Sequence, residues 1–272
     1  MLRDITFGQY VFARSPIHRM DPRIKLVFTI VLIVLLFAAK TIPGFAVNTL
    51  LLLLIYVASK IPFKMALRSL KPILPIVLFT GMLNIFFVTG EAQPLLSIWR
   101  IAVYKEGIFF AVTFTLRICM VVAGSSLLTY TTSPTELTDA IERLLWPFKY
   151  LKLPVHELAM MMTIALRFIP LLIDETVKIM NAQKSRGADM DSGKLIQRIK
   201  ALVPVLVPLF ISSFRRADEL ALAMECRCYR GGEGRTRMKQ LKLKFVDLAG
   251  TLCFLVFFSG VIACNYYFTR IL

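Results

Sequence analysis

The sequence predicts an all-α integral membrane protein with about five transmembrane helices and a cytoplasmic domain of about three helices, two of them long. Hydrophobic residues make up 57% of the 272-residue chain and the mean hydropathy is +0.69, above what soluble globular proteins show. The apolar residues gather in separate runs that approach the length of a membrane span. Charged residues concentrate in one segment, residues 131–245, which separates the fourth apolar run from the fifth.

Residues 1–25 form a charged N-terminal segment, and we expect the first span to begin after it. Residues 26–130 contain four apolar runs, and residues 246–268 contain the final one. The five runs are Leu26–Ala39, Phe45–Ala58, Ile73–Val88, Ile108–Tyr130 and Val246–Phe268. A helix needs about 20 residues to cross a bilayer, so the first two runs must extend into their flanks unless they form a re-entrant hairpin.

The distribution of Lys and Arg predicts the orientation, because cytoplasmic loops retain these residues. The loop after the second run holds four cations and no acid: Lys60, Lys64, Arg68 and Lys71. The loop after the third run has two cations, which are offset by two acids: Arg100 and Lys105, with Glu91 and Glu106. We therefore expect the N-terminus in the cytoplasm and the C-terminus outside.

Residues 131–245 hold 19 of the 33 Lys and Arg residues and 12 of the 17 Asp and Glu residues, which predicts a cytoplasmic segment. Two stretches inside it, residues 158–173 and 201–211, are nonetheless largely apolar. We expect these stretches to lie at the membrane face.

Three helices are expected within this segment. Ser133-Pro134-Thr135-Glu136 predicts the start of the first, with Ser as N-cap and Glu closing a capping box. The second is expected from about Val155 to Arg186, with Gly187 as its left-handed cap. The third is expected from about Lys194 to Arg227 or Arg230. The two longer helices should each measure about 45 to 50 Å.

The same short pattern stands at the end of both long helices. The copies are Ala182-x-x-Ser185-Arg186-Gly187 and Ala223-x-x-Cys226-Arg227-Cys228. An arginine between small residues can enter a groove and form two parallel hydrogen bonds with a carboxylate. The repeated ending therefore predicts a pair of equivalent docking points. The alternative is that each arginine only stabilises the negative end of a helix dipole, an effect of roughly 0.3 to 1 kcal/mol.

Other kinds of site are disfavoured. The net charge of +16 is explained by cytoplasmic loops, so no nucleic-acid partner is expected. The chain lacks the G-x-x-x-x-G-K-[ST] motif for binding ATP, and Cys226-x-Cys228 has no second cysteine pair to complete a metal site. We expect no cofactor, no metal and no catalysis by this chain. Arg117, inside the fourth run, is expected to form a structural pair or an interhelix hydrogen bond in preference to binding substrate.

Two further functional classes remain open. A self-contained secondary transporter would have its substrate site among the spans, although the scarcity of acids there disfavours proton coupling. A membrane-anchored scaffold would bind anionic lipid through its basic segment, although the charges of residues 131–245 are mixed.

The chain resembles the transmembrane T component, EcfT, of energy-coupling factor (ECF) transporters. The likeness covers almost the whole chain and is carried by five motifs in order, together with the layout of five spans and a cytoplasmic insert. The motifs are His18-Arg19-Met20-Asp21-Pro22-Arg23-Ile24-Lys25-Leu26, Ser133-Pro134-Thr135-Glu136-Leu137, Leu166-Arg167-Phe168-Ile169-Pro170, Ala182-Gln183-Lys184-Ser185-Arg186-Gly187 and residues 223–232.

This resemblance implies a non-catalytic coupling subunit in a prokaryotic plasma membrane, with residues 131–245 as the coupling domain. In that family, the small-Arg-small ends of two helices dock into grooves of two ATP-binding cassette ATPase subunits. Arg186 would then contact one ATPase and Arg227 the other, and ATP would be used by those partners. The motion would pass to a separate substrate-binding membrane protein, the S component, which carries a vitamin or a metal ion inward. The second motif often has Ala before the arginine and Gly or another small residue after it, where this chain has Cys226 and Cys228.

Overall fold

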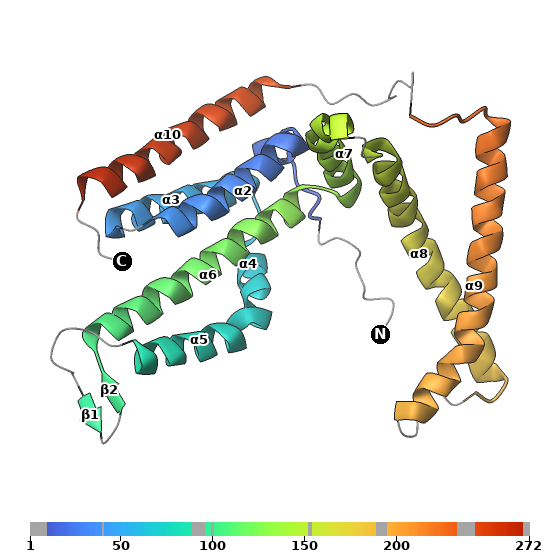
Figure 1. The fold of residues 1–272 in the computed structure, drawn as a ribbon, viewed down its shortest axis with the longest axis horizontal. Helices are drawn as coiled ribbons and strands as arrows, with labels where there is room; N and C mark the ends of the chain where they lie inside the picture. The colour runs from blue at the N-terminus through green and yellow to red at the C-terminus, as the bar shows by residue number, and fades with distance from the viewer. Residues whose placement is uncertain are drawn as a thin grey trace. The chain divides into compact units, whose positions relative to one another are not determined.

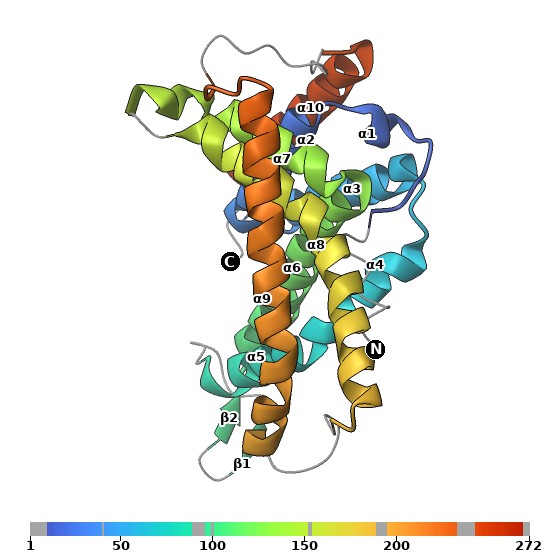
Figure 2. The ribbon, with the colours of Figure 1, turned by 90° about the vertical axis from the view of Figure 1, so that its right-hand side faces the viewer.

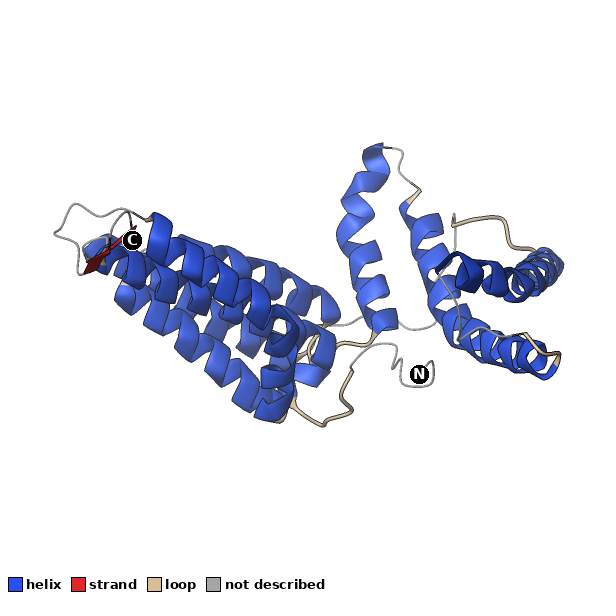
Figure 3. Cartoon of the chain, turned by 90° about the horizontal axis from the view of Figure 1, so that it is seen from below, coloured by secondary structure: helices blue, strands red, loops and turns tan. Residues whose placement is uncertain are grey.

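The computed structural model describes residues 10–39, 41–88, 96–98, 101–151, 154–188, 195–232 and 243–268. Helices form nearly all of its regular structure (Figures 1 and 3). In chain order the elements are α1 (Pro16–Arg19), α2 (Pro22–Ala38), α3 (Ile42–Ser59), α4 (Phe63–Leu70), the 3₁₀ helix η2 (Lys71–Ile73), α5 (Leu74–Phe87), β1 (Leu96–Ile98), β2 (Ile101–Val103), α6 (Lys105–Thr131), α7 (Pro134–Leu145), the 3₁₀ helix η3 (Trp146–Leu151), α8 (Val155–Ser185), α9 (Leu195–Cys226) and α10 (Phe245–Tyr267).

The predicted fold class is confirmed, with one addition in the connection between α5 and α6. There β1 and β2 pair antiparallel, with Ser97 opposite Ala102. Each strand has three residues. Isoleucine and valine favour extended backbone, which accounts for a short hairpin where the sequence analysis expected a loop.

Five helical stretches of the described chain are long and apolar enough to cross a membrane. They are Ile42–Ser59, Phe63–Phe87, Lys105–Thr131, Val155–Ser185 and Phe245–Tyr267. Four of them cover expected runs, two of these to within one residue at the C-terminal end. The fifth is α8, which the sequence analysis assigned to the cytoplasmic segment. Helix α2 covers the first expected run but has only 17 residues.

The described residues fall into two compact units. The bundle unit comprises residues 10–140 and 243–268, and the paired-helix unit comprises residues 141–232. The limits that the sequence analysis gave for the cytoplasmic segment, residues 131 and 245, stay a prediction.

The bundle unit is built around α2, α3, α6 and α10, which lie side by side (Figure 1). Apolar side chains from these helices and the neighbouring segments form two buried clusters. One contains Leu32, Leu35, Leu36, Ala39, Leu51, Phe254 and Val261, and the other contains Tyr56, Ile61, Ala66, Ala123, Leu127 and Tyr130. The Phe28 and Phe254 rings stack with their centroids 4.4 Å apart, which joins α2 to α10.

Buried polar groups tie three helix ends together on one side of this bundle. The carboxylate of Asp247, at the start of α10, accepts hydrogen bonds from the backbone N–H of Asp21 at 2.7 Å and of Lys244 at 2.6 Å. The ammonium of Lys25, in the first turn of α2, donates to the carbonyl of Thr131 at the end of α6 at 2.9 Å. The starts of α2 and α10 and the end of α6 therefore share one side of the bundle.

Arg117 makes the interhelix hydrogen bond that the sequence analysis favoured for it. Its Nη2 donates to the carbonyl of Ala39 at 2.8 Å, and its guanidinium lies 5.8 Å from the centroid of the Phe37 ring. The last carbonyls of a helix lack partners within the helix, so Arg117 on α6 satisfies one at the end of α2.

The start of helix α7 confirms Ser133 as the N-cap and Pro134 as the first helical residue. Ser133 Oγ accepts the backbone N–H of Glu136 at 3.3 Å, and Pro134 is the first helical residue. A proline costs nothing there because its missing N–H would have no partner in the first turn.

Candidate docking site at the ends of two long helices

Helices α8 and α9 pack side by side and run in opposite directions (Figure 2). Gln183 Nε2, near the end of α8, donates to the carbonyl of Pro204, near the start of α9, at 3.3 Å. Further along, the carboxylate of Glu175 accepts from Ser212 Oγ and pairs with the guanidinium of Arg216. As the residue number falls along α8, it rises along α9, so the pair is antiparallel.

The contact continues past the end of α9. A Cβ atom built on Gly232 would lie 2.5 Å from Cδ2 of His156, in the first turn of α8. The imidazole Nδ1 of His156 is 3.1 Å from the carboxylate of Glu142. The segment that follows α9 therefore reaches the start of α8. At 1.5 Å per residue, Arg186 and Arg227 are about 40 Å apart along the pair.

Two prolines explain why Gln183 finds an acceptor on α9. Pro204 and Pro208 are four residues apart inside α9. In a regular helix, the N–H of residue 208 would bond to the carbonyl of residue 204, but proline has no N–H. The Pro204 carbonyl is thus left for the Gln183 side chain, and this hydrogen bond anchors the last turns of α8 to α9.

Helix α8 ends in a Schellman motif, in which two backbone N–H groups just beyond the helix donate to carbonyls in its last turn. Gly187 takes the left-handed conformation with a φ of 85°, as predicted. Its N–H donates to the carbonyl of Lys184 at 3.0 Å, and the N–H of Ala188 donates to the carbonyl of Gln183 at 3.0 Å. Arg186 is the C-cap residue between helix and turn.

Helix α9 ends in the same motif. Cys228 takes the left-handed position with a φ of 56°. Its N–H donates to the carbonyl of Glu225 at 2.8 Å, and the N–H of Tyr229 donates to the carbonyl of Met224 at 3.0 Å. Arg227 therefore occupies the C-cap position, like Arg186 on α8. The repeated sequence pattern corresponds to a repeated backbone geometry.

Every residue predicted for the docking points is exposed. These residues are Ala182, Ser185, Arg186, Gly187, Ala223, Cys226, Arg227 and Cys228. Among the residues that the structure describes, neither guanidinium has a hydrogen-bond or ion-pair partner. Backbone N–H groups of the turn bond to carbonyls in the last turn of each helix, so these carbonyls do not require the arginine side chains. We call each of these two helix ends, with its arginine and flanking small residues, an arginine tip.

Residues that support the tips were not all found by sequence reasoning. The sequence leaves the partner of Glu175 open, because Arg216 is 41 residues away and only the antiparallel packing brings the two together. For the Gln183 contact the sequence contains one weak signal. Pro204 and Pro208 are four residues apart, which indicates a free carbonyl at Pro204. Within the described parts of the chain, no group of three or more His, Cys, Asp or Glu side chains is placed to hold a metal ion.

The fold and these tips define a multi-pass, all-α membrane protein that displays two matching arginine tips at opposite ends of an antiparallel helix pair. Comparison with known proteins identifies the family. Residues 13–238 match the family model CbiQ, described as cobalt transport protein. The chain belongs to this family, among the EcfT transmembrane components of energy-coupling factor transporters.

Similar proteins cover nearly the full chain. The energy-coupling factor transporter transmembrane protein EcfT of Ruminiclostridium cellulolyticum is 52% identical over 98% of this chain and 100% of its own length. The EcfT of Clostridium kluyveri is 56% identical over 94% of this chain and 95% of its own. The EcfT of Bacillus subtilis is 46% identical over 89% of this chain and 91% of its own.

Proposed function

We propose that this chain is the coupling subunit of an ECF-type importer, in which Arg186 docks into one ATP-binding cassette ATPase and Arg227 into a second. The observation that carries this proposal is the pair of matching Schellman endings, each with an exposed arginine at its C-cap position that has no partner among the described residues. An exposed guanidinium beside small residues favours a bidentate bond to a carboxylate in a partner's groove.

The antiparallel packing favours two partners over one. Because the tips are about 40 Å apart along the pair, a single groove does not reach both. The Glu175–Arg216 pair and the Gln183–Pro204 hydrogen bond hold the two helices together. A movement of one tip is therefore transmitted to the other helix, which is the property that a coupling element between two ATPases requires.

The apolar surface of the same helix pair is proposed to contact the substrate-binding membrane protein. Large hydrophobic side chains are exposed along both helices: Leu158, Met161, Met162 and Leu171 on α8, and Ile196, Ile199, Leu202, Val203, Leu206, Val207, Phe210, Ile211, Phe214 and Leu222 on α9. Flexible methionine side chains adapt to different partner surfaces. We propose that ATP-driven motion passes through this surface and reorients a partner that carries a vitamin or a metal ion inward.

Arginine replacements at the tips test this function. We expect Arg186→Ala and Arg227→Ala each to weaken co-purification of the ATPases or to uncouple ATP hydrolysis from uptake, and the double variant to abolish uptake. Arg186→Lys should also be impaired, since an ammonium lacks the planar fork of a guanidinium. Arg215→Ala is the matched control, because Arg215 is an exposed arginine on α9 away from the tip.

Normal assembly and uptake in the Arg186→Ala/Arg227→Ala variant would contradict the proposal. Uptake by the purified chain in vesicles without any ATPase would instead support the secondary transporter.

A further inference from the structure

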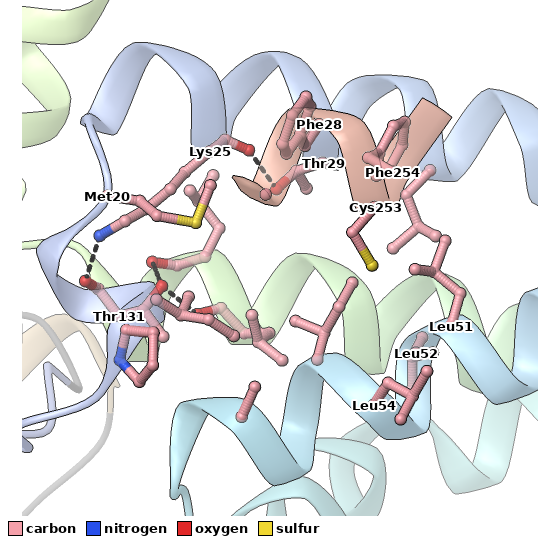
Figure 4. Close-up of a pocket in the computed structure, with 18 of the residues that line it drawn as sticks. Met20, Lys25, Phe28, Thr29, Leu51, Leu52, Leu54, Thr131, Cys253 and Phe254 are labelled. Atoms are coloured by element: carbon pink, nitrogen blue, oxygen red, sulfur yellow. Dashed lines mark hydrogen bonds between the residues drawn. The ribbon is translucent and has the colours of Figure 1, made fainter. Parts of the chain in front are cut away.

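A cavity of about 400 Å³, partly open to its surroundings, lies among the helices of the bundle unit (Figure 4). Its walls come from α2, α3, α6 and α10, and α1 with the residue after it covers one end through Pro16, Ile17 and Met20. The walls are almost wholly apolar. They include Phe28 and Leu32 on α2, Leu51 and Ile55 on α3, Leu127 on α6 and Phe254 on α10. The thiol of Cys253 on α10 points into this space.

The few polar side chains in the wall already have partners within the chain. The Lys25 ammonium donates to the carbonyl of Thr131 at 2.9 Å. The Thr29 hydroxyl donates to the carbonyl of Lys25 at 2.8 Å, and the Thr131 hydroxyl donates to the carbonyl of Leu127 at 2.8 Å. A polar ligand would find few free partners here, and ordered water needs two to four of them. The cavity is therefore suited to an apolar occupant.

A bilayer supplies such an occupant directly. An unfilled space between packed helices forfeits dispersion contacts on all its walls and destabilises the fold. The surrounding helices α3, α6 and α10 are all long and apolar enough to span a membrane. Lipid acyl chains are thus the abundant apolar groups around this part of the chain.

The positive charge of the segment around α1 favours a lipid with an anionic headgroup. Arg14 and Arg19 are exposed on the segment that covers the cavity. The one acid among residues 10–25 is Asp21, which is buried and lies 3.3 Å from the guanidinium of Arg23. The exposed charges of residues 10–25 are therefore cationic, and arginine binds phosphate through charge-assisted hydrogen bonds.

We propose that this cavity binds an acyl chain of an anionic glycerophospholipid whose phosphate pairs with Arg19 and Arg14. On the predicted orientation this lipid belongs to the cytoplasmic leaflet, where anionic lipids concentrate. The bound chain fills the space between α10 and the other three helices. The lipid site is independent of the arginine tips.

Native mass spectrometry of the full-length chain tests the proposal, after reconstitution in nanodiscs of phosphatidylglycerol and phosphatidylcholine and release into mild detergent. The wild type should retain one phosphatidylglycerol. Cys253→Trp places a bulky ring in the cavity and should lose it. Leu252→Trp is the matched control, because Leu252 is exposed on the same helix but does not line the cavity. Arg19→Glu should reduce the preference for phosphatidylglycerol by about tenfold or more.

Equal lipid retention by Cys253→Trp and Leu252→Trp, or no retention by the wild type, would overturn the proposal. Alkylation of native Cys253 by N-ethylmaleimide gives a second measurement that needs no variant. Phosphatidylglycerol should slow this reaction and leave that of Cys226, exposed on the paired-helix unit, unchanged. An unchanged rate at Cys253 would likewise count against an occupied cavity.

Discussion

Arg186 and Arg227 both occupy the C-cap position of their helices. The residues that follow them differ in the free energy that the left-handed backbone conformation costs. Gly187 and Cys228 both adopt the left-handed conformation, with φ values of 85° and 56°. Glycine does so freely, whereas a residue with a Cβ atom loses roughly 1 to 2 kcal/mol. The second tip therefore keeps its geometry against a local strain that the first tip lacks.

Replacing Cys228 by glycine and Gly187 by alanine should have opposite effects on the stability of the two helix ends. Cys228→Gly relieves strain and should stabilise the end of α9 by up to about 1 kcal/mol, after the extra entropy of glycine in the unfolded chain. Gly187→Ala should destabilise the end of α8 by about 1 kcal/mol or more. Amide hydrogen exchange of the last turn of each helix measures both changes.

At Gly187 the effect of backbone conformation can be measured without steric contacts. A Cβ atom added there would meet no other atom within 4 Å, so any loss in Gly187→Ala arises from the backbone conformation. Faster exchange at the end of α9 in Cys228→Gly would show that the Cys228 side chain stabilises the turn through contacts that outweigh its strain.

At the scale of elements, the link between α8 and α9 depends on a small number of polar contacts. Pro204 and Pro208 leave a carbonyl that accepts from Gln183, and Glu175 joins Arg216 and Ser212. The outer faces of both helices are apolar and exposed. The antiparallel register is thus set by polar groups that have specific partners, and the apolar surface remains available to other molecules.

The Glu175–Arg216 pair can be tested by a double-mutant cycle. Glu175→Gln and Arg216→Gln should each lower the free energy of unfolding by about 1 to 2 kcal/mol, since both side chains are partly screened by solvent. The double variant should cost less than the sum of the two, because the second change removes a group already without its partner. Thermal unfolding of the purified chain in detergent, followed by circular dichroism, gives the values.

Asp218→Asn provides the control, since Asp218 is an exposed acid on the same helix. Additive effects of Glu175→Gln and Arg216→Gln would mean that the pair contributes no coupling energy.

At the scale of the whole molecule, the orientation of α8 decides whether both tips reach the same compartment. Helix α8 is long and apolar enough to span a membrane. If it crossed the bilayer alongside the antiparallel α9, Arg186 and Arg227 would lie on opposite sides. Docking to two cytoplasmic ATPases instead requires both tips on the cytoplasmic side, with the helix pair along the membrane surface.

Thiol labelling distinguishes these arrangements. In a variant that keeps Cys228 as its only native cysteine and carries Ser185→Cys, a membrane-impermeant maleimide should label both positions in inside-out vesicles. It should label neither in intact cells, because the exposed thiols lie in the cytoplasm. Labelling of one of the two from outside would show that the pair crosses the membrane and would remove the basis for twin docking.

Local signals in the sequence predicted much of the fold. Apolar runs predicted four of the five stretches that could span a membrane, and Ser133-Pro134-Thr135-Glu136 predicted the start of α7. Gly187 predicted the left-handed cap of α8. Helix length, capping and hydropathy depend on residues within a few turns of each other, so they can be read along the chain.

Taken by itself, the sequence determined that this is a helical membrane protein with two arginine endings, at Arg186 and Arg227. Only the tertiary structure decided that these endings lie at opposite ends of an antiparallel pair, and that a cavity opens among α2, α3, α6 and α10. The physical reason is distance along the chain. Contacts such as Glu175–Arg216 and Asp21–Asp247 join residues 41 and 226 positions apart, and their partners are selected by the packing of the whole fold.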